Sequence, residues 1–81
     1  MATIYIVEDD VNIREIERYA LKNSGYQVEG FECAHDFYKK LEEKQPDLVL
    51  LDIMLPEEDG LSILRRLRAS PRTEHLPVMM L

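Results

Sequence analysis

The stretch PDLVLLDIMLP, residues 46–56, contains four consecutive apolar residues that end on an aspartate. A short apolar run with no alternating polar residues is typical of a strand buried on both faces of a parallel sheet. Pro46 ends any helix that precedes this run. Asp52 follows the run directly, and open α/β sheets bind their ligands beyond the carboxyl ends of the strands. The stretch therefore predicts a parallel sheet with a carboxylate at its ligand-binding edge.

The rest of the chain fits the same kind of sheet. Residues 4–7 and 78–81 are further apolar runs, and the more polar segment 26–31 fits an edge strand. Three helical stretches separate these strands, and each has apolar residues at helical spacing along one face. These residues are Ile13, Ile16 and Ala20 in the first helix, Phe37 and Leu41 in the second, and Leu61, Leu64 and Leu67 in the third. Asp10 is expected to cap the first helix and Gly25 to end it. Strands and helices that alternate in this way predict an α/β fold with right-handed crossovers.

The composition excludes several classes of protein. The 81 residues include 16 acidic and 10 basic side chains, which gives a net charge of −6. With 46% hydrophobic residues the chain is too apolar for intrinsic disorder, and no run approaches the roughly 18–20 residues that span a bilayer. Net acidity argues against direct contact with nucleic acid. The single cysteine, Cys33, excludes an intramolecular disulfide, so we expect a cytoplasmic chain without membrane contact.

The last residues bear on domain organisation. The chain stops at Leu81, inside the fourth apolar run. A complete α/β domain would continue with a turn or a helix, so we expect residues 1–81 to be the N-terminal part of one longer domain. Residues 78–81 would then form a flat hydrophobic edge, through which the chain is expected to self-associate.

Carboxylates follow two of the predicted strands. Glu8, Asp9 and Asp10 come after the first strand, and Asp52 after the third. If these strands are neighbours, Asp9 and Asp52 converge, and two carboxylates about 4 Å apart repel by roughly 4 kcal/mol at an effective dielectric near 20. Such a cluster holds protons or a cation, and oxygen ligands without His or Cys favour Mg²⁺. Asp10 alone has a simpler interpretation as a helix cap.

These segments resemble the receiver domains of two-component response regulators. The matching segments are residues 6–10, 46–56 and 59–60. Their spacing agrees with that family along all 81 residues. Met54, Leu55 and Pro56 most resemble the subfamily whose receivers are fused to winged-helix DNA-binding domains. The resemblance implies a flavodoxin-like, three-layer receiver fold with strand order 2-1-3-4-5, of which this chain would hold the first four strands and three helices.

The resemblance also implies roles for individual residues. Asp52 would be the phosphoacceptor, which attacks the phosphohistidine of a sensor histidine kinase. Asp9 and Asp52 would bind Mg²⁺ directly, Glu8 through water, and Met54 through its backbone carbonyl. The chain would then be a signalling phosphoacceptor rather than an enzyme in the ordinary sense.

Two residues of the family pattern have no counterpart. A Ser or Thr after the fourth strand and a Lys after the fifth would both lie beyond Leu81. Arg14 is near the correct end of the sheet, but we expect it to be solvated on the first helix. Loss of such electrostatic stabilisation commonly costs about 10²–10³ in rate, so slow or absent phosphorylation is expected.

Three other functions are compatible with parts of the same pattern. A phosphatase of the haloacid-dehalogenase type also places an aspartate after a buried strand, but it requires a second acid where this chain has Met54. A nucleotide-binding domain would need a Gly-rich loop after the first strand. An interaction module that keeps the fold without phosphorylation is a third alternative.

Overall fold

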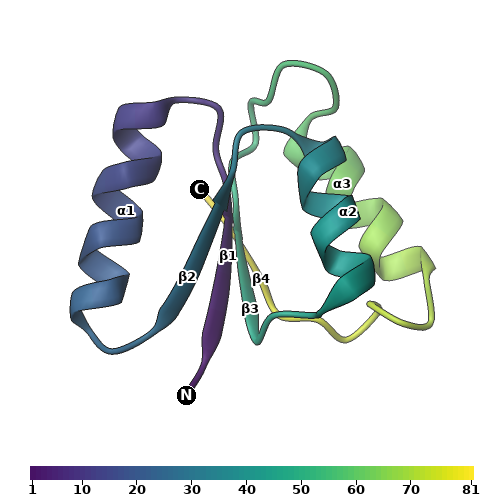
Figure 1. Cartoon of the computed structure of the whole chain (residues 1–81). Coiled ribbons are helices and arrows are strands. Elements are labelled where there is room, and N and C mark those ends of the chain that lie inside the picture. Colours follow the sequence, from purple (N-terminus) through teal and green to yellow (C-terminus); the bar gives the residue numbers. More distant parts are fainter.

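Four strands and three helices alternate along the chain in a computed structural model that describes residues 1–81 (Figure 1). The elements are β1 (Thr3–Val7), α1 (Val11–Asn23), β2 (Gln27–Phe31), α2 (Ala34–Glu43), β3 (Leu48–Leu51), α3 (Gly60–Ala69) and β4 (Val78–Met80). The predicted order of elements is confirmed. Two predicted strands are one residue shorter, since β2 begins at Gln27 and β4 ends at Met80.

The strands form one parallel sheet in the order β2-β1-β3-β4. The central strand β1 pairs with both β2 and β3, so the first and third strands are neighbours. Helix α1 covers one face of the sheet, whereas α2 and α3 cover the other (Figure 1). This three-layer arrangement (Figure 1) confirms the predicted α/β fold of flavodoxin type.

The main core lies between the sheet and the helices α2 and α3. Its fully buried side chains include Tyr5 of β1, Phe37 of α2 and Ile63 of α3. The rings of Tyr5, Phe31 and Phe37 meet edge to face, with centroids 5.2–6.4 Å apart. The buried Tyr5 hydroxyl donates a hydrogen bond of 2.7 Å to the carbonyl of Lys44. The one polar group of the buried Tyr5 ring therefore has a hydrogen-bond partner.

The ends of α1 agree with the sequence, but its predicted packing face is wrong. The Asp10 carboxylate accepts hydrogen bonds from the amides of residues 12 and 13, and Gly25 adopts a φ of +96° just after the helix. Ile13 and Ala20 are exposed, however, and Ile16 is 70% exposed. Helix α1 lies across β1 and β2, so the residues turned inward are those beside the predicted stripe, such as Leu21.

The predicted face of α3 needs a smaller correction. Leu67 is buried and Leu64 partly buried, but Leu61 is 47% exposed and Ile63 takes its place in the core. Gly60, the first residue of the helix, packs against the backbone of residues 52 and 53. The buried face of α3 consists of Gly60, Ile63 and Leu67. None of the three helices has both the length and the apolar character that a membrane span requires.

Candidate functional site

The register between β1 and β3 brings the two acidic segments to the same edge of the sheet. Val7 and Leu51 are partners in the parallel ladder. Hydrogen bonding continues one residue further, because the Asp52 amide donates to the Val7 carbonyl at 3.0 Å and the Glu8 amide donates to the Phe31 carbonyl at 2.9 Å. The backbone at Glu8 and Asp52 therefore leaves the sheet at the same level.

Three carboxylates meet at this edge. One oxygen from each of Glu8, Asp9 and Asp52 lies within 4.8 Å of the others, and we call these residues the acidic cluster. Glu8 is 7% exposed, Asp52 is half-buried and Asp9 is exposed. None of the ion pairs in the structure involves these three side chains. The acidic cluster thus brings together three carboxylate groups, and no basic side chain of the protein pairs with them.

Burial and repulsion both act on Glu8. The pKa of its carboxyl is raised to about 7, and burial is the largest cause. The amide of Asp10, which donates to Oε2 at 3.2 Å, acts in the opposite direction. The neighbouring carboxylates of Asp52 and Asp9 contribute to the rise. A proton or a cation relieves the excess negative charge, and a site made only of oxygen donors suits a hard cation such as Mg²⁺.

Glu17 of α1 adds to this negative field and is missed by sequence reasoning. Burial raises the pKa of its carboxyl, and repulsion from Asp52 raises it further. Its Oε1 atom is buried and has no hydrogen-bond partner. A glutamate in the middle of an amphipathic helix gives no signal of this position in the sequence.

The loop from Asp52 to Asp59 folds back on itself beyond β3. The Met54 amide donates to Oδ1 of Asp52 at 3.2 Å, and the Gly60 amide donates to the Ile53 carbonyl at 2.8 Å. Asp59 caps α3 by accepting a hydrogen bond from the amide of Ser62 at 2.8 Å. The Met54 side chain is 80% exposed, so its backbone, rather than its side chain, takes part in the local structure.

Glu58 ties this loop to the two helices on the same face of the sheet. Its carboxylate accepts a hydrogen bond from the Tyr38 hydroxyl at 3.2 Å and pairs with Nη1 of Arg66 at 3.0 Å. The Arg66 guanidinium in turn lies 4.3 Å from the centroid of the Tyr38 ring, which is a cation–π contact. The three residues form a closed contact between α2, the loop and α3, and the sequence alone does not indicate it.

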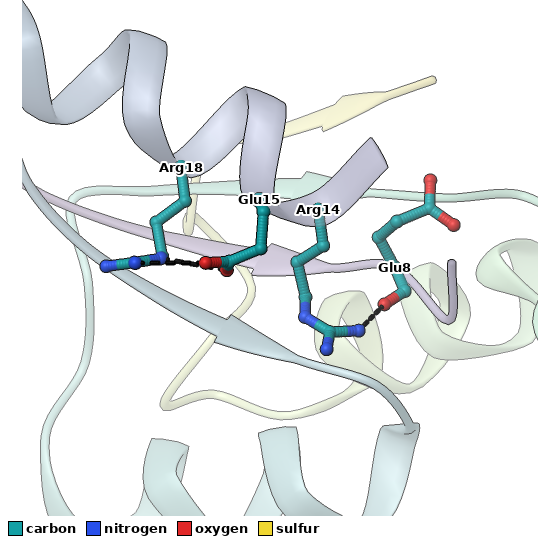
Figure 2. A network of polar contacts seen from close by, with 4 residues as sticks. All are labelled: Glu8, Arg14, Glu15 and Arg18. Atoms are coloured by element: carbon teal, nitrogen blue, oxygen red, sulfur yellow. Dashed lines mark hydrogen bonds and ion pairs between the residues drawn. The ribbon is translucent and has the colours of Figure 1, made fainter. Parts of the chain in front are cut away.

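Arg14 is only partly exposed to solvent, which corrects the expectation of a solvated position on the first helix. Its side chain is half-buried, and Nη1 donates a hydrogen bond of 2.7 Å to the backbone carbonyl of Glu8 (Figure 2). Arg18, one turn further along α1, instead pairs with Glu15 at 3.0 Å (Figure 2).

Curated relatives share the sequence over most of this chain. The transcriptional regulatory protein GltR of Pseudomonas aeruginosa is 39% identical over 79 residues, which are 98% of this chain and 33% of that protein. The phosphate regulon transcriptional regulatory protein PhoB of Rhizobium meliloti is 40% identical over 78 residues, 96% of this chain and 34% of that protein. The chain spans about a third of the length of these curated relatives.

Solved structures share the fold. The N-terminal domain of a response regulator receiver protein from Methanoculleus marisnigri JR1 superposes with a TM-score of 0.93 at 34% identity, over 99% of this chain and 65% of that one. The signal receiver domain of a signal transduction histidine kinase from Syntrophus aciditrophicus gives 0.95 at 32% identity, over 100% and 61%.

The family model described as the response regulator receiver domain matches residues 4–81, which is nearly the whole chain. The strand order, the acidic cluster at the carboxyl edge of the sheet and these similarities agree with one another. The chain therefore belongs to the response regulator receiver domain family.

Proposed function

We propose that the chain accepts a phosphoryl group on Asp52 from the phosphohistidine of a sensor histidine kinase, in a reaction that requires Mg²⁺. One observation carries the proposal: the carboxylates that follow β1 and β3 converge at the edge of the sheet where α/β folds bind ligands. Membership of the receiver family supports the same assignment.

The acidic cluster has the donors that Mg²⁺ prefers. Asp9 and Asp52 would bind the ion directly, Glu8 would bind it through water, and the backbone carbonyl of Met54 would be a further ligand. The raised pKa of Glu8 fits this role, because a carboxylate that is buried and lies beside other carboxylates gains most from a nearby cation. When bound, the ion would neutralise the carboxylates and attract the oxygens of the incoming phosphoryl group.

Asp52 itself performs the covalent step. A carboxylate oxygen of Asp52 attacks phosphorus, so the new O–P bond forms as the N–P bond of the phosphohistidine breaks, and the electron pair remains on the imidazole nitrogen. The Met54 amide, which donates to Oδ1, holds the orientation of the carboxylate during this step. The protein would then be a phosphoacceptor rather than an enzyme that turns over a separate substrate.

The wider context is part of the same proposal. The curated relatives named above are transcriptional regulators about three times as long as this chain. We infer that in its full-length context this receiver controls a winged-helix DNA-binding domain, and that it meets its kinase in the cytoplasm. The acidic receiver segment would not contact DNA itself, because its net charge of −6 repels phosphate.

Intact-mass spectrometry after incubation with acetyl phosphate and Mg²⁺ tests the central step. The wild-type chain should slowly gain the mass of one phosphoryl group and lose it on treatment with hydroxylamine. Asp52→Asn should gain nothing, whereas Asp36→Asn, which removes an exposed carboxylate from α2, should behave like the wild type. A wild-type chain without an adduct would favour the interaction module, and an adduct on Asp52→Asn would show that another residue is modified.

A further inference from the structure

We infer that Arg14 is a positioning residue for residues 8–10, which we call the acidic turn. Its guanidinium acts on the turn through a hydrogen bond to the backbone carbonyl of Glu8. Its side chain reaches that carbonyl because Gly30, which it crosses, has no side chain. The part of this inference that concerns Mg²⁺ rests on the proposed function. The part that concerns the backbone of the turn does not.

The Glu8 carbonyl lies just beyond the sheet, where it has no strand amide as a hydrogen-bond partner. The Glu8 amide still donates to Phe31, but β2 ends there, and no backbone amide donates to the Glu8 carbonyl. Arg14 supplies the donor instead, at 2.7 Å from Nη1 to the carbonyl oxygen. Because polar backbone groups at buried positions need partners, this contact decides how the peptide between Glu8 and Asp9 is held.

Gly30 explains how the arginine reaches this carbonyl. Gly30 lies in β2 opposite Ile6, and a Cβ built on it would be 2.9 Å from Cδ and 3.0 Å from Cγ of Arg14. The aliphatic part of Arg14 therefore passes directly over the glycine. Glycine weakens the interior of a strand, and its presence there is typical of a close approach by another group.

The contact is made to the backbone and not to the carboxylates. Arg14 forms no ion pair, and Figure 2 shows its guanidinium at the Glu8 carbonyl while the Glu8 carboxylate extends away from it. The carboxylate stays free for the acidic cluster, while the backbone that carries it is fixed from the other side. In metal sites, groups that orient the ligands in this way commonly change metal affinity by about 10–100-fold when they are removed.

Two substitutions disturb the contact in different ways. Arg14→Met keeps an unbranched stem and removes the donors, whereas Gly30→Ala keeps the guanidinium and displaces the stem with a methyl group. Arg18→Met is the matched control, because Arg18 lies on the same helix and pairs only with Glu15.

The first measurement is NMR spectroscopy of the metal-free chain. We expect Arg14→Met and Gly30→Ala to shift the Glu8 carbonyl resonance. We also expect both to speed hydrogen exchange at the Asp10 amide, which donates to Oε2 of the Glu8 side chain. Gly30→Ala should add nothing in the Arg14→Met background, and Arg18→Met should leave both signals unchanged. An unchanged Glu8 carbonyl in Arg14→Met, or additive effects of the two substitutions, would overturn the inference.

The second readout is Mg²⁺ affinity by calorimetry on the same variants. We expect about tenfold weaker binding in Arg14→Met and Gly30→Ala and no change in Arg18→Met. A wild-type chain that does not bind Mg²⁺ would overturn the proposed function, while the NMR result would still decide the role of Arg14. Equal affinities in wild type and Arg14→Met, despite a shifted carbonyl, would overturn the link between Arg14 and the metal.

Discussion

Gly60 and Asp52 are in backbone contact so close that no side chain fits between them. A Cβ built on Gly60 would overlap the carbonyl oxygen of Asp52 and would lie 2.9 Å from Cα of Ile53. The Gly60 amide also donates to the Ile53 carbonyl at 2.8 Å. The first residue of α3 therefore packs directly against the loop that carries the proposed phosphoacceptor.

Gly60→Ala should consequently damage both stability and the site. The methyl group meets backbone rather than a flexible side chain, and overpacking of this kind costs about 1–3 kcal/mol in the free energy of unfolding. Urea denaturation measures that loss, and a Mg²⁺ titration of the remaining folded protein should show weaker binding.

Gly25→Ala is the control for this substitution. Its φ of +96° makes alanine strained, but nothing lies within 4 Å of the added Cβ. We expect Gly25→Ala to lower stability and to leave Mg²⁺ affinity unchanged. Equal Mg²⁺ affinity in Gly60→Ala and wild type would mean that the contact with Asp52 does not shape the site.

The acidic cluster should make the metal-free fold sensitive to pH through Glu8. Its pKa is about 7 in the folded chain against an ordinary value of 4.5, so between pH 4.5 and pH 7 the folded chain binds a proton at Glu8 that the unfolded chain does not. The contribution of this proton to the stability of the fold is fully present below about pH 4.5 and is lost as the pH rises through 7. Glu8→Gln removes this dependence, and we expect the variant to have a higher Tm than wild type at pH 8 without metal.

The difference in Tm between Glu8→Gln and wild type should shrink as the pH falls toward 4.5. Glu57→Gln, in the exposed part of the β3–α3 loop, should not change the Tm at pH 8 or near pH 4.5. A Tm difference for Glu8→Gln that does not vary with pH would show that burial and repulsion at Glu8 are weaker than the structure indicates.

Glu58 should restrain the β3–α3 loop. Glu58→Gln removes the charge that pairs with Arg66 and weakens the acceptor for Tyr38, and charge-assisted hydrogen bonds are about twice as strong as neutral ones. We expect faster amide hydrogen exchange across residues 53–59 and a loss of less than about 1.5 kcal/mol in stability. Glu57→Gln should leave exchange at the wild-type rate, and identical exchange in both variants would contradict the proposed restraint.

The strand β4 should mediate self-association of the 81-residue chain. It is an edge of the sheet, and Met79 on it is 53% exposed. Exposed apolar edge strands pair with other chains, and a lysine on the edge prevents this. Light scattering over a range of concentrations should show a rising mass for wild type and a constant monomer mass for Met79→Lys, and a wild-type monomer at all concentrations would refute the prediction.

The sheet and the meeting of the acidic segments could be predicted from sequence for a physical reason. Continuous apolar runs such as residues 48–51 are compatible with few structures other than a doubly covered strand. Asp9 and Asp52 follow the carboxyl ends of their strands, and the pairing of β1 with β3 brings them together.

The helix faces and the supporting contacts could not be predicted in the same way. Ile13 and Ile16 have helical spacing, but the rotation of α1 on the sheet decides which residues turn inward, and that rotation depends on tertiary packing. Arg14 and Glu58 look like surface charges in the sequence. Their partners, the Glu8 carbonyl and the Tyr38 hydroxyl, become neighbours only after the chain has folded.

The pairing of β1 with β3 has a thermodynamic consequence, because it joins donors that are more than forty positions apart in the chain. An unfolded chain cannot gather these oxygens, so an ion that occupies them binds the native state alone. Linkage then requires such an ion to stabilise the fold by RT ln(1 + [L]/Kd), about 1.4 kcal/mol at ten times Kd. Melting curves recorded against increasing magnesium would therefore report occupancy of the acidic cluster without any label or partner protein.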